Sequence, residues 1–242
     1  MSERTPERPR HPRDFEDDED VRDLEAEGML PNGLQPVDPR DVNPRREFVK
    51  LSRRVCLIER DDGAEATGFL VAPDLIFTTA HALMGTSGIF ADPGHVTVKF
   101  DHFLWNKESG TRAMGDQCKL RRIPFSKPAQ PDVVASSIKT DPKCRRRYDD
   151  NGLDYVLVRL DRPMGLAFLP YSHRLRGWNN CSRADVPAEG EVFVVQHPEG
   201  RLQKFAEGYI PADHSDHEFP HFFRYRTTSL NGSSGSPGGN GS

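Results

Sequence analysis

The chain has 242 residues, with 35% hydrophobic residues, 29% charged residues and a formal net charge of −4. This length suffices for one large domain or two small ones. No apolar run approaches the roughly 18 residues of a membrane-spanning helix, and the slightly acidic balance offers no general basic surface for nucleic acid or anionic lipid. The composition therefore predicts a soluble protein with neither a nucleic-acid partner nor a membrane partner.

The first 46 residues differ from the rest in charge. They contain 13 acidic and 8 basic residues, a net charge of −5, whereas residues 47–242 contain 24 and 25, a net charge of +1. We predict that residues 1–46 form a disordered acidic, proline-rich segment. It is either a solvated tail or a docking arm for a partner. The segment lacks the apolar stretch of a secretion signal, and the four cysteines are widely spaced, so we expect a cytoplasmic protein with reduced thiols.

From about residue 50, short apolar segments alternate with turn residues, which predicts β-structure. The first three segments are joined by short polar turns and are expected to form a meander. Together, six segments are expected to close a first barrel of about six strands over residues 47–165, with residues 101–116 and 124–150 as long loops. The expected strands are Ser52–Arg60, Ala66–Val71, Leu75–Thr79, His95–Phe100, Gln117–Ile123 and Leu153–Leu160.

A second group of strands follows over residues 166–242. The expected strands are Glu191–Gln196, Leu202–Ile210 and His221–Thr227. After them, ten of the fourteen residues from Ser229 to Ser242 are glycine or serine, which by composition alone is typical of a flexible linker.

Three short segments carry side chains that can act together. His81 follows an apolar strand in Thr78–Leu83, and Asp154 precedes the apolar run of Leu153–Leu160, where a carboxylate needs hydrogen-bond donors. Ser234 lies between glycines in Gly232–Pro237, in a tight turn where backbone N–H groups can converge. Each residue alone is more often structural: a satisfied histidine, a turn aspartate and a linker serine. Their order along the chain favours a catalytic triad instead.

The segments T-T-A-H-A-L, D-Y-V-L-V-R-L and G-S-S-G-S-P resemble the active-site motifs of chymotrypsin-like (trypsin-like) serine peptidases. The bacterial, glutamyl-endopeptidase-like type is the most similar, since the stretches at Val194–Gly200 and Phe223–Ser236 also resemble segments of those sequences. The resemblance covers roughly residues 50–237. It implies an all-β, chymotrypsin-like double β-barrel, in which residues 47–165 supply the histidine and aspartate and residues 166–242 supply the serine.

The resemblance also implies a serine endopeptidase that acts on protein or peptide substrates through an acyl-enzyme. Ser234 would be the nucleophile, His81 the general base and Asp154 the acid that orients the histidine. The backbone N–H groups of Gly232 and Ser234 would form the oxyanion hole. No cofactor and no metal is expected. Asp149 and Asp150 are rival acids, but neither begins an apolar strand.

Two departures from the family pattern bear on activity. Ser233 occupies the position of the aspartate that pairs with a freed N-terminus in animal digestive enzymes, and the sequence has no Ile-Val-Gly-Gly start. The family continues for two or three strands beyond the nucleophile, so we expect a truncated chain whose second barrel lacks its last strands. The alternatives are a catalytically inactive, protease-derived binding or scaffold protein, a truncated fragment, or an ordinary β protein with a Gly/Ser tail.

Two charged clusters lie outside these motifs. The spacing of His214, His217 and His221 could collect a metal ion, but the sequence of Asp213–His217 is more typical of a solvated acidic loop. The basic run Lys143–Arg147 is expected to be a solvated loop rather than an anion site.

Overall fold

A computed structural model gives the positions of the residues on which the fold and the site depend. It describes residues 50–85, 88–102, 104–106, 111–112, 115–137, 153–169, 174–180, 189–212 and 225–240. Several predictions made from the sequence lie outside these ranges: the acidic segment 1–46, the basic run Lys143–Arg147, the rival acids Asp149 and Asp150, and the histidine cluster 213–221.

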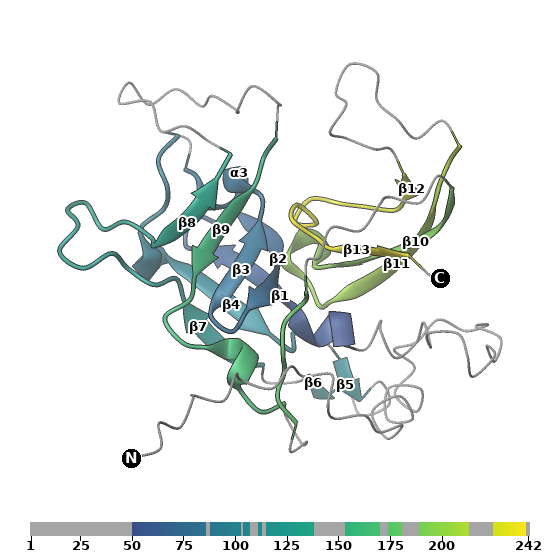
Figure 1. Cartoon of the computed structure of the whole chain (residues 1–242), viewed down its shortest axis with the longest axis horizontal. Coiled ribbons are helices and arrows are strands. Elements are labelled where there is room, and N and C mark those ends of the chain that lie inside the picture. Colours follow the sequence, from purple (N-terminus) through teal and green to yellow (C-terminus); the bar gives the residue numbers. More distant parts are fainter. Residues whose placement is uncertain are drawn as a thin grey trace, which may run out of the picture.

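The first half of the chain forms a seven-stranded antiparallel sheet, with the order β7-β4-β1-β2-β3-β9-β8 (Figure 1). The predicted meander is confirmed by the neighbouring positions of β1, β2 and β3. Six strands were expected, and the seventh is β8. The strands are β1 (Val55–Arg60), β2 (Glu65–Ala72), β3 (Leu75–Thr78), β4 (Val96–Phe100), β7 (Gln117–Lys119), β8 (Val133–Ser136) and β9 (Val156–Arg159).

Alternation of side chains explains how this sheet encloses a core. In β4, Val96, Val98 and Phe100 are fully buried, whereas the two residues between them are only half-buried. The sheet curls on itself, so that Leu120, just beyond the edge strand β7, forms a bridge with Leu160, just beyond β9, the strand next to the opposite edge. This closure gives the inward apolar side chains of all the strands a common interior.

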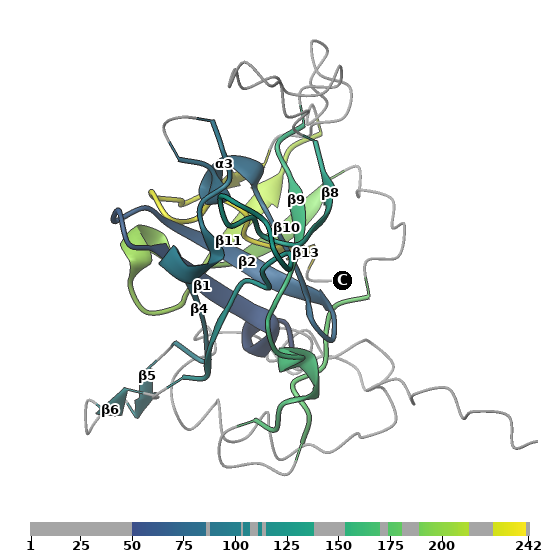
Figure 2. The ribbon, with the colours of Figure 1, turned by 90° about the vertical axis from the view of Figure 1, so that its left-hand side faces the viewer.

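The second half of the chain forms a four-stranded antiparallel sheet, which lies beside the first sheet in Figure 1 and behind it in Figure 2. β10 and β11 pair along their whole length, from Gly190↔Ile210 to Gln196↔Lys204. The sheet order is β12-β11-β10-β13, and the strands are β10 (Gly190–Gln196), β11 (Lys204–Ile210), β12 (Arg226–Thr227) and β13 (Gly238–Asn240).

The remaining elements are short. β5 (Leu104–Asn106) and β6 (Thr111–Arg112) form a separate two-stranded ribbon. The helical turns are residues 50–54, α3 (Ala80–Leu83), η2 (Pro93–His95), η3 (Met164–Leu166) and η4 (Pro198–Gly200). Among the described residues, none of the helices has the length and apolar character that a membrane crossing requires.

Four expectations about local structure were wrong. Residues 101–116, expected to be a long loop, contain the two-stranded ribbon of β5 and β6. The strand expected from Ser52 begins only at Val55, because residues 50–54 are helical. Residues 124–150, expected to be a loop, contain β8, which pairs with β9 although prolines precede it. The glycine-rich end, which composition alone assigns to a linker, contains β13; glycines at 238 and 239 pair with β10 through their backbone groups.

Two groups of contacts fix the second half of the chain to the first. Val55 on β1 and Val195 on β10 are fully buried and form one apolar cluster. Three phenylalanines pack against this cluster: Phe69, Phe193 and Phe205. In addition, the guanidinium of the fully buried Arg176, on the segment that connects the sheets, donates to Asp101 (2.8 Å), to Asp116 (2.9 Å) and to the carbonyl of Arg53 (3.0 Å). The connecting segment is thereby fixed to the end of β4.

The predicted boundary between the two barrels, at residues 165 and 166, falls within η3. The strands described above lie on either side of it, with the seven-stranded sheet before η3 and the four-stranded sheet after it. The division into residues 1–46, 47–165 and 166–242 stays a prediction.

Candidate active site

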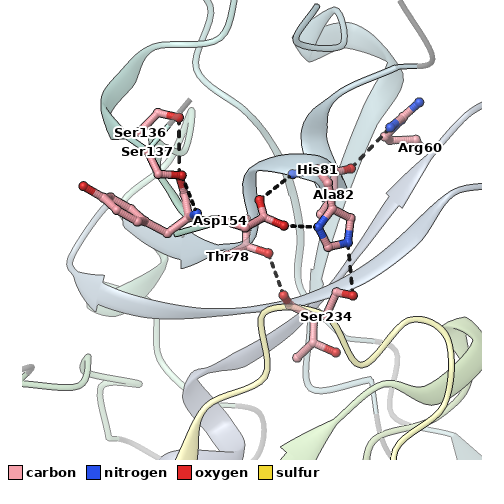
Figure 3. A network of polar contacts seen from close by, with 10 residues as sticks. Arg60, Thr78, His81, Ala82, Ser136, Ser137, Asp154 and Ser234 are labelled. Carbon is pink, nitrogen blue, oxygen red and sulfur yellow. Dashed lines mark hydrogen bonds and ion pairs between the residues drawn. The ribbon is translucent and has the colours of Figure 1, made fainter. Parts of the chain in front are cut away.

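His81 lies in α3, a single helical turn that begins directly after β3. The buried side chains of Ala80 and Leu83 fix this turn to the core. Its C-terminal carbonyls are satisfied by Arg60 on β1, whose Nη1 donates to the carbonyl of Met84 (2.5 Å) and to that of Ala82 (3.4 Å). A buried helix end needs such partners, so Arg60 helps to set the position of the turn that carries the histidine (Figure 3).

Asp154 lies two residues before β9. Because β9 pairs with β3, with Val156 opposite Thr78, Asp154 comes close to the start of α3. Ser137, which follows β8, holds Tyr155, the residue after Asp154. The backbone N–H of Tyr155 donates to Ser137 Oγ (2.9 Å), and the backbone N–H of Ser137 donates to the carbonyl of Tyr155 (3.0 Å). The carboxylate is therefore positioned from both neighbouring strands.

The Asp154 carboxylate binds His81 at two points. The imidazole Nδ1–H donates to Oδ2, and the backbone N–H of His81 donates to Oδ1 at 3.1 Å. Burial raises the pKa of Asp154, but hydrogen bonds from His81 and from the backbone of Ala80 outweigh burial and hold that pKa below its usual value. The ionised carboxylate fixes the tautomer of His81 that leaves Nε2 as an acceptor.

Ser234 completes the group, because its Oγ lies 3.1 Å from His81 Nε2 (Figure 3). The loop that carries it requires glycine on both sides. Gly232 has a φ of 87°, and a Cβ there would lie 2.7 Å from the carbonyl oxygen of His197; Gly235 has a φ of 85°, and a Cβ there would lie 2.2 Å from the carbonyl oxygen of Thr67. Glycine is thus required at both ends of G-S-S-G, because the loop backbone passes too close to the backbones of His197 and Thr67 to leave room for a Cβ.

The structure brings together all the residues that the sequence singled out for catalysis. Asp154, His81 and Ser234 form a continuous chain of contacts, although 73 residues separate the first two and 153 separate His81 from Ser234. The alternative of an ordinary β protein required His81 and Asp154 to lie apart, and this arrangement contradicts it. Within the described residues, the N–H groups of Gly232 and Ser234 donate to no protein acceptor.

Three buried side chains that can titrate, one histidine and two cysteines, take no part in the chemistry of the site. His197, beside the serine loop, is fully buried, and burial lowers its pKa to about 4, so the ring is neutral. Its Nδ1–H donates to the carbonyl of Arg201 (3.0 Å). Cys56 and Cys118 are free and buried; burial raises the pKa of Cys118 to about 12 and that of Cys56 well above its usual value, so neither is a nucleophile.

No group of three or more His, Cys, Asp or Glu side chains that could hold a metal ion occurs in the described ranges. The histidine cluster at residues 213–221 lies outside them.

Sequence reasoning missed three side chains that hold the site: Arg60, Ser137 and Thr67. Thr67 left the clearest signal, because a polar residue at a buried position of the apolar segment Ala66–Val71 needs a hydrogen-bond partner. Arg60 and Ser137 have no such signal, since arginine at a strand end and serine in a loop are ordinary surface residues.

The family model of the trypsin-like peptidase domain matches residues 66–240. Solved structures similar to this chain include Deg5 (14% identity, 86% of this chain and 83% of that one, TM-score 0.49) and a Glu endopeptidase (13%, 79% and 76%, 0.47). The inactive form of Rv3671c from M. tuberculosis H37Rv is also similar (16%, 86% and 79%, 0.43). No curated protein sequence matches the chain. The sequence match alone spans most of the chain and includes all three residues of the candidate site, and the all-β architecture with two sheets agrees with it: the chain belongs to the trypsin-like peptidase domain family.

Proposed function

We propose that this protein is a serine endopeptidase that hydrolyses peptide bonds through an acyl-enzyme on Ser234. The observation that carries the proposal is the continuous series of hydrogen bonds from the Asp154 carboxylate through the His81 imidazole to Ser234 Oγ. Membership of a peptidase family supports proteins or peptides as the substrates.

Each side chain has one role in the proposed reaction. Ser234 Oγ attacks the carbonyl carbon of the substrate while His81 Nε2 takes the hydroxyl proton. As the tetrahedral intermediate collapses, the proton passes to the leaving amine, and the acyl group stays on Ser234 as an ester. Water, deprotonated by the same imidazole, then releases the acid. Asp154 stabilises the imidazolium that forms in each step and keeps the ring oriented.

The negative charge that develops on the substrate oxygen needs fixed donors. We assign this role to the N–H groups of Gly232 and Ser234. The carbonyl of Asn231 accepts a hydrogen bond from the N–H of Glu199 at 2.5 Å. Because the C=O and N–H of a trans peptide point in opposite directions, the N–H of Gly232 points away from η4 and remains available.

The decisive experiment is covalent labelling with a fluorophosphonate probe, followed by intact mass. We expect one adduct on the wild type and none on Ser234→Ala or His81→Ala. Ser233→Ala is the matched control, because it removes the hydroxyl of the adjacent residue and should leave labelling in place. No adduct on folded wild-type protein would refute the proposal and favour a binding protein without turnover.

A second measurement tests the endopeptidase assignment. Peptides blocked at both termini and carrying an internal quenched fluorophore report only internal cleavage. We expect turnover that Ser234→Ala abolishes. Labelling of Ser234 without cleavage of any blocked peptide, combined with release of terminal residues from free peptides, would instead show an exopeptidase.

A further inference from the structure

We propose that Thr67 is a positioning residue whose side-chain hydroxyl fixes the nucleophile loop, Leu230–Pro237, against the first sheet. The inference rests on the proposed function, since it assigns a role in the same reaction. Thr67 touches no reacting atom of the site; it acts through the backbone of the loop.

The first observation is that Thr67 holds the loop at two points. Its backbone N–H donates to the carbonyl of Ser234 at 2.9 Å, and its hydroxyl donates to the carbonyl of Gly232 at 2.8 Å. These two carbonyls belong to the nucleophile and to the residue that we assign to the oxyanion hole. One residue of β2 therefore sets the position of both.

The second observation is that the hydroxyl also ties the loop to the segment behind it. Thr67 Oγ1 accepts from the backbone N–H of His197 at 2.9 Å while it donates to Gly232. A hydroxyl has one proton and two lone pairs, so both bonds are made at once. The N–H of Glu199, two residues along, binds the carbonyl of Asn231. The carbonyls of Asn231 and Gly232 are both held by hydrogen bonds, so the peptide groups on the two sides of the Gly232 Cα are fixed. The N–H of Gly232 therefore has a single orientation.

The third observation is that Thr67 is itself fixed. Its side chain is fully buried, and its carbonyl accepts from the hydroxyl of Thr78 on β3 at 2.7 Å. The loop approaches so closely that a Cβ at Gly235 would lie 2.2 Å from that same carbonyl. Thr78 stands three residues before His81, so the network links the strand leading to the base with the loop carrying the nucleophile.

The test compares two substitutions. Thr67→Val keeps the branched shape and removes the hydroxyl, whereas Thr67→Ser keeps the hydroxyl and removes the methyl group. We expect Thr67→Val to lower the rate of fluorophosphonate labelling, and kcat on a blocked peptide, by roughly 10-fold to 100-fold, with KM changed much less. Thr67→Ser should stay close to the wild type. If poorer packing alone lowered the rate, Thr67→Ser, which lacks the methyl group, would lose activity and Thr67→Val would not.

Thr97→Val supplies the matched control, because Thr97 lies on β4 of the same sheet and its hydroxyl contacts only Lys119 among the described residues. It should leave labelling unchanged. If Thr67→Val does not fold, Thr67→Ala removes the same hydroxyl without placing a methyl group against Gly232, and the same criteria apply. Equal rates for the hydroxyl-lacking variants and Thr97→Val would overturn the inference, as would an equal loss in Thr67→Ser.

A readout independent of catalysis separates this inference from the proposed function. Amide hydrogen exchange of peptides covering residues 230–236 should speed up in Thr67→Val and not in Thr67→Ser. Wild-type protein that is not labelled at Ser234 would refute the proposed function, while the exchange rates would still decide whether Thr67 holds the loop. Wild-type labelling with unchanged exchange and unchanged rate in Thr67→Val would refute this inference alone.

Discussion

The seven-stranded sheet packs its inward side chains into one continuous apolar cluster, whereas the nucleophile loop of the second half is held by hydrogen bonds to that sheet. Leu83 lies in α3 with His81, and Ile76 lies on β3, which leads into α3 and pairs with β9; both are fully buried in this cluster. Ser234, by contrast, is fixed mainly through Thr67 and its neighbours. The positions of the base and the acid are thus fixed by the apolar core of the first sheet. The position of the nucleophile is fixed by a small network of hydrogen bonds.

The comparison separates two kinds of substitution. Changes in the apolar cluster should lower stability first, and changes in the polar contacts should lower activity while the fold persists.

Asp154→Asn should abolish most of the activity without unfolding the protein. The amide can still accept from the backbone N–H of His81, but its NH₂ faces Nδ1 and forces the imidazole into the tautomer that cannot accept the Ser234 proton. The expected loss in kcat is about 10⁴-fold, the size known for the same change in a comparable protease. Steady-state kinetics and the melting temperature check both halves of the prediction; a melting temperature several degrees lower would show that the acid is structural.

Phe100→Ala should cost about 3 to 5 kcal/mol of unfolding free energy, because Phe100 is fully buried in the first sheet. Phe193→Ala is the matched change in the second sheet, where the ring is only partly buried, and should cost clearly less. Urea denaturation of both variants measures the difference. Equal losses would show that the two sheets depend equally on apolar packing.

His197 should make the protein sensitive to acid. The unfolded chain binds a proton on this imidazole near pH 6.5, but the folded chain does so only near pH 4. The unfolded state therefore holds more protons in between, and stability present above pH 6.5 is lost as the pH falls to about 4, by about 3 kcal/mol. His197→Asn should flatten this part of the pH profile of unfolding.

His95→Asn is the control for the acid effect. His95 is exposed, and a hydrogen bond from its ring to Asp61 raises its pKa, so its titration does not destabilise the folded state at low pH. The loss of stability between pH 6.5 and 4 should persist in this variant. If it persists equally in His197→Asn, another group causes it.

Ser137→Ala should have the smallest effect, about 1 kcal/mol of stability and a loss of activity of a few fold. The substitution removes the acceptor of the Tyr155 N–H, next to Asp154, but leaves the backbone bond from Ser137 to Tyr155 in place. Ser136→Ala is matched to it, since the Ser136 hydroxyl donates to the Tyr155 carbonyl at the longer distance of 3.3 Å and does not accept from the Tyr155 N–H, so it should matter less. Kinetics and thermal melting of the pair distinguish the two.

The strands with regular alternation or long apolar runs were readily predicted from the sequence. β4 and β10 match their predicted ranges to within one residue, because a sheet with one buried face imposes its period on the sequence. The missed strands, β5, β6, β8 and β13, are short, and their pairing depends on backbone groups that any residue has. Ser52 was assigned to a strand because local propensity gives no account of the helical turn at residues 50–54.

The sequence by itself determined which residues make up the candidate site. A histidine after an apolar strand, an aspartate before another and a serine between two glycines are local patterns, and local chemistry sets the roles each can take. Only the tertiary structure decided that the three meet, since the pairing of β3 with β9 places Asp154 beside His81, and the contact between β2 and the loop places Ser234 beside both. It alone revealed the partners of Thr67, because a polar residue in an apolar strand signals that it needs a hydrogen bond but does not identify partners 130 and 165 positions away in the chain.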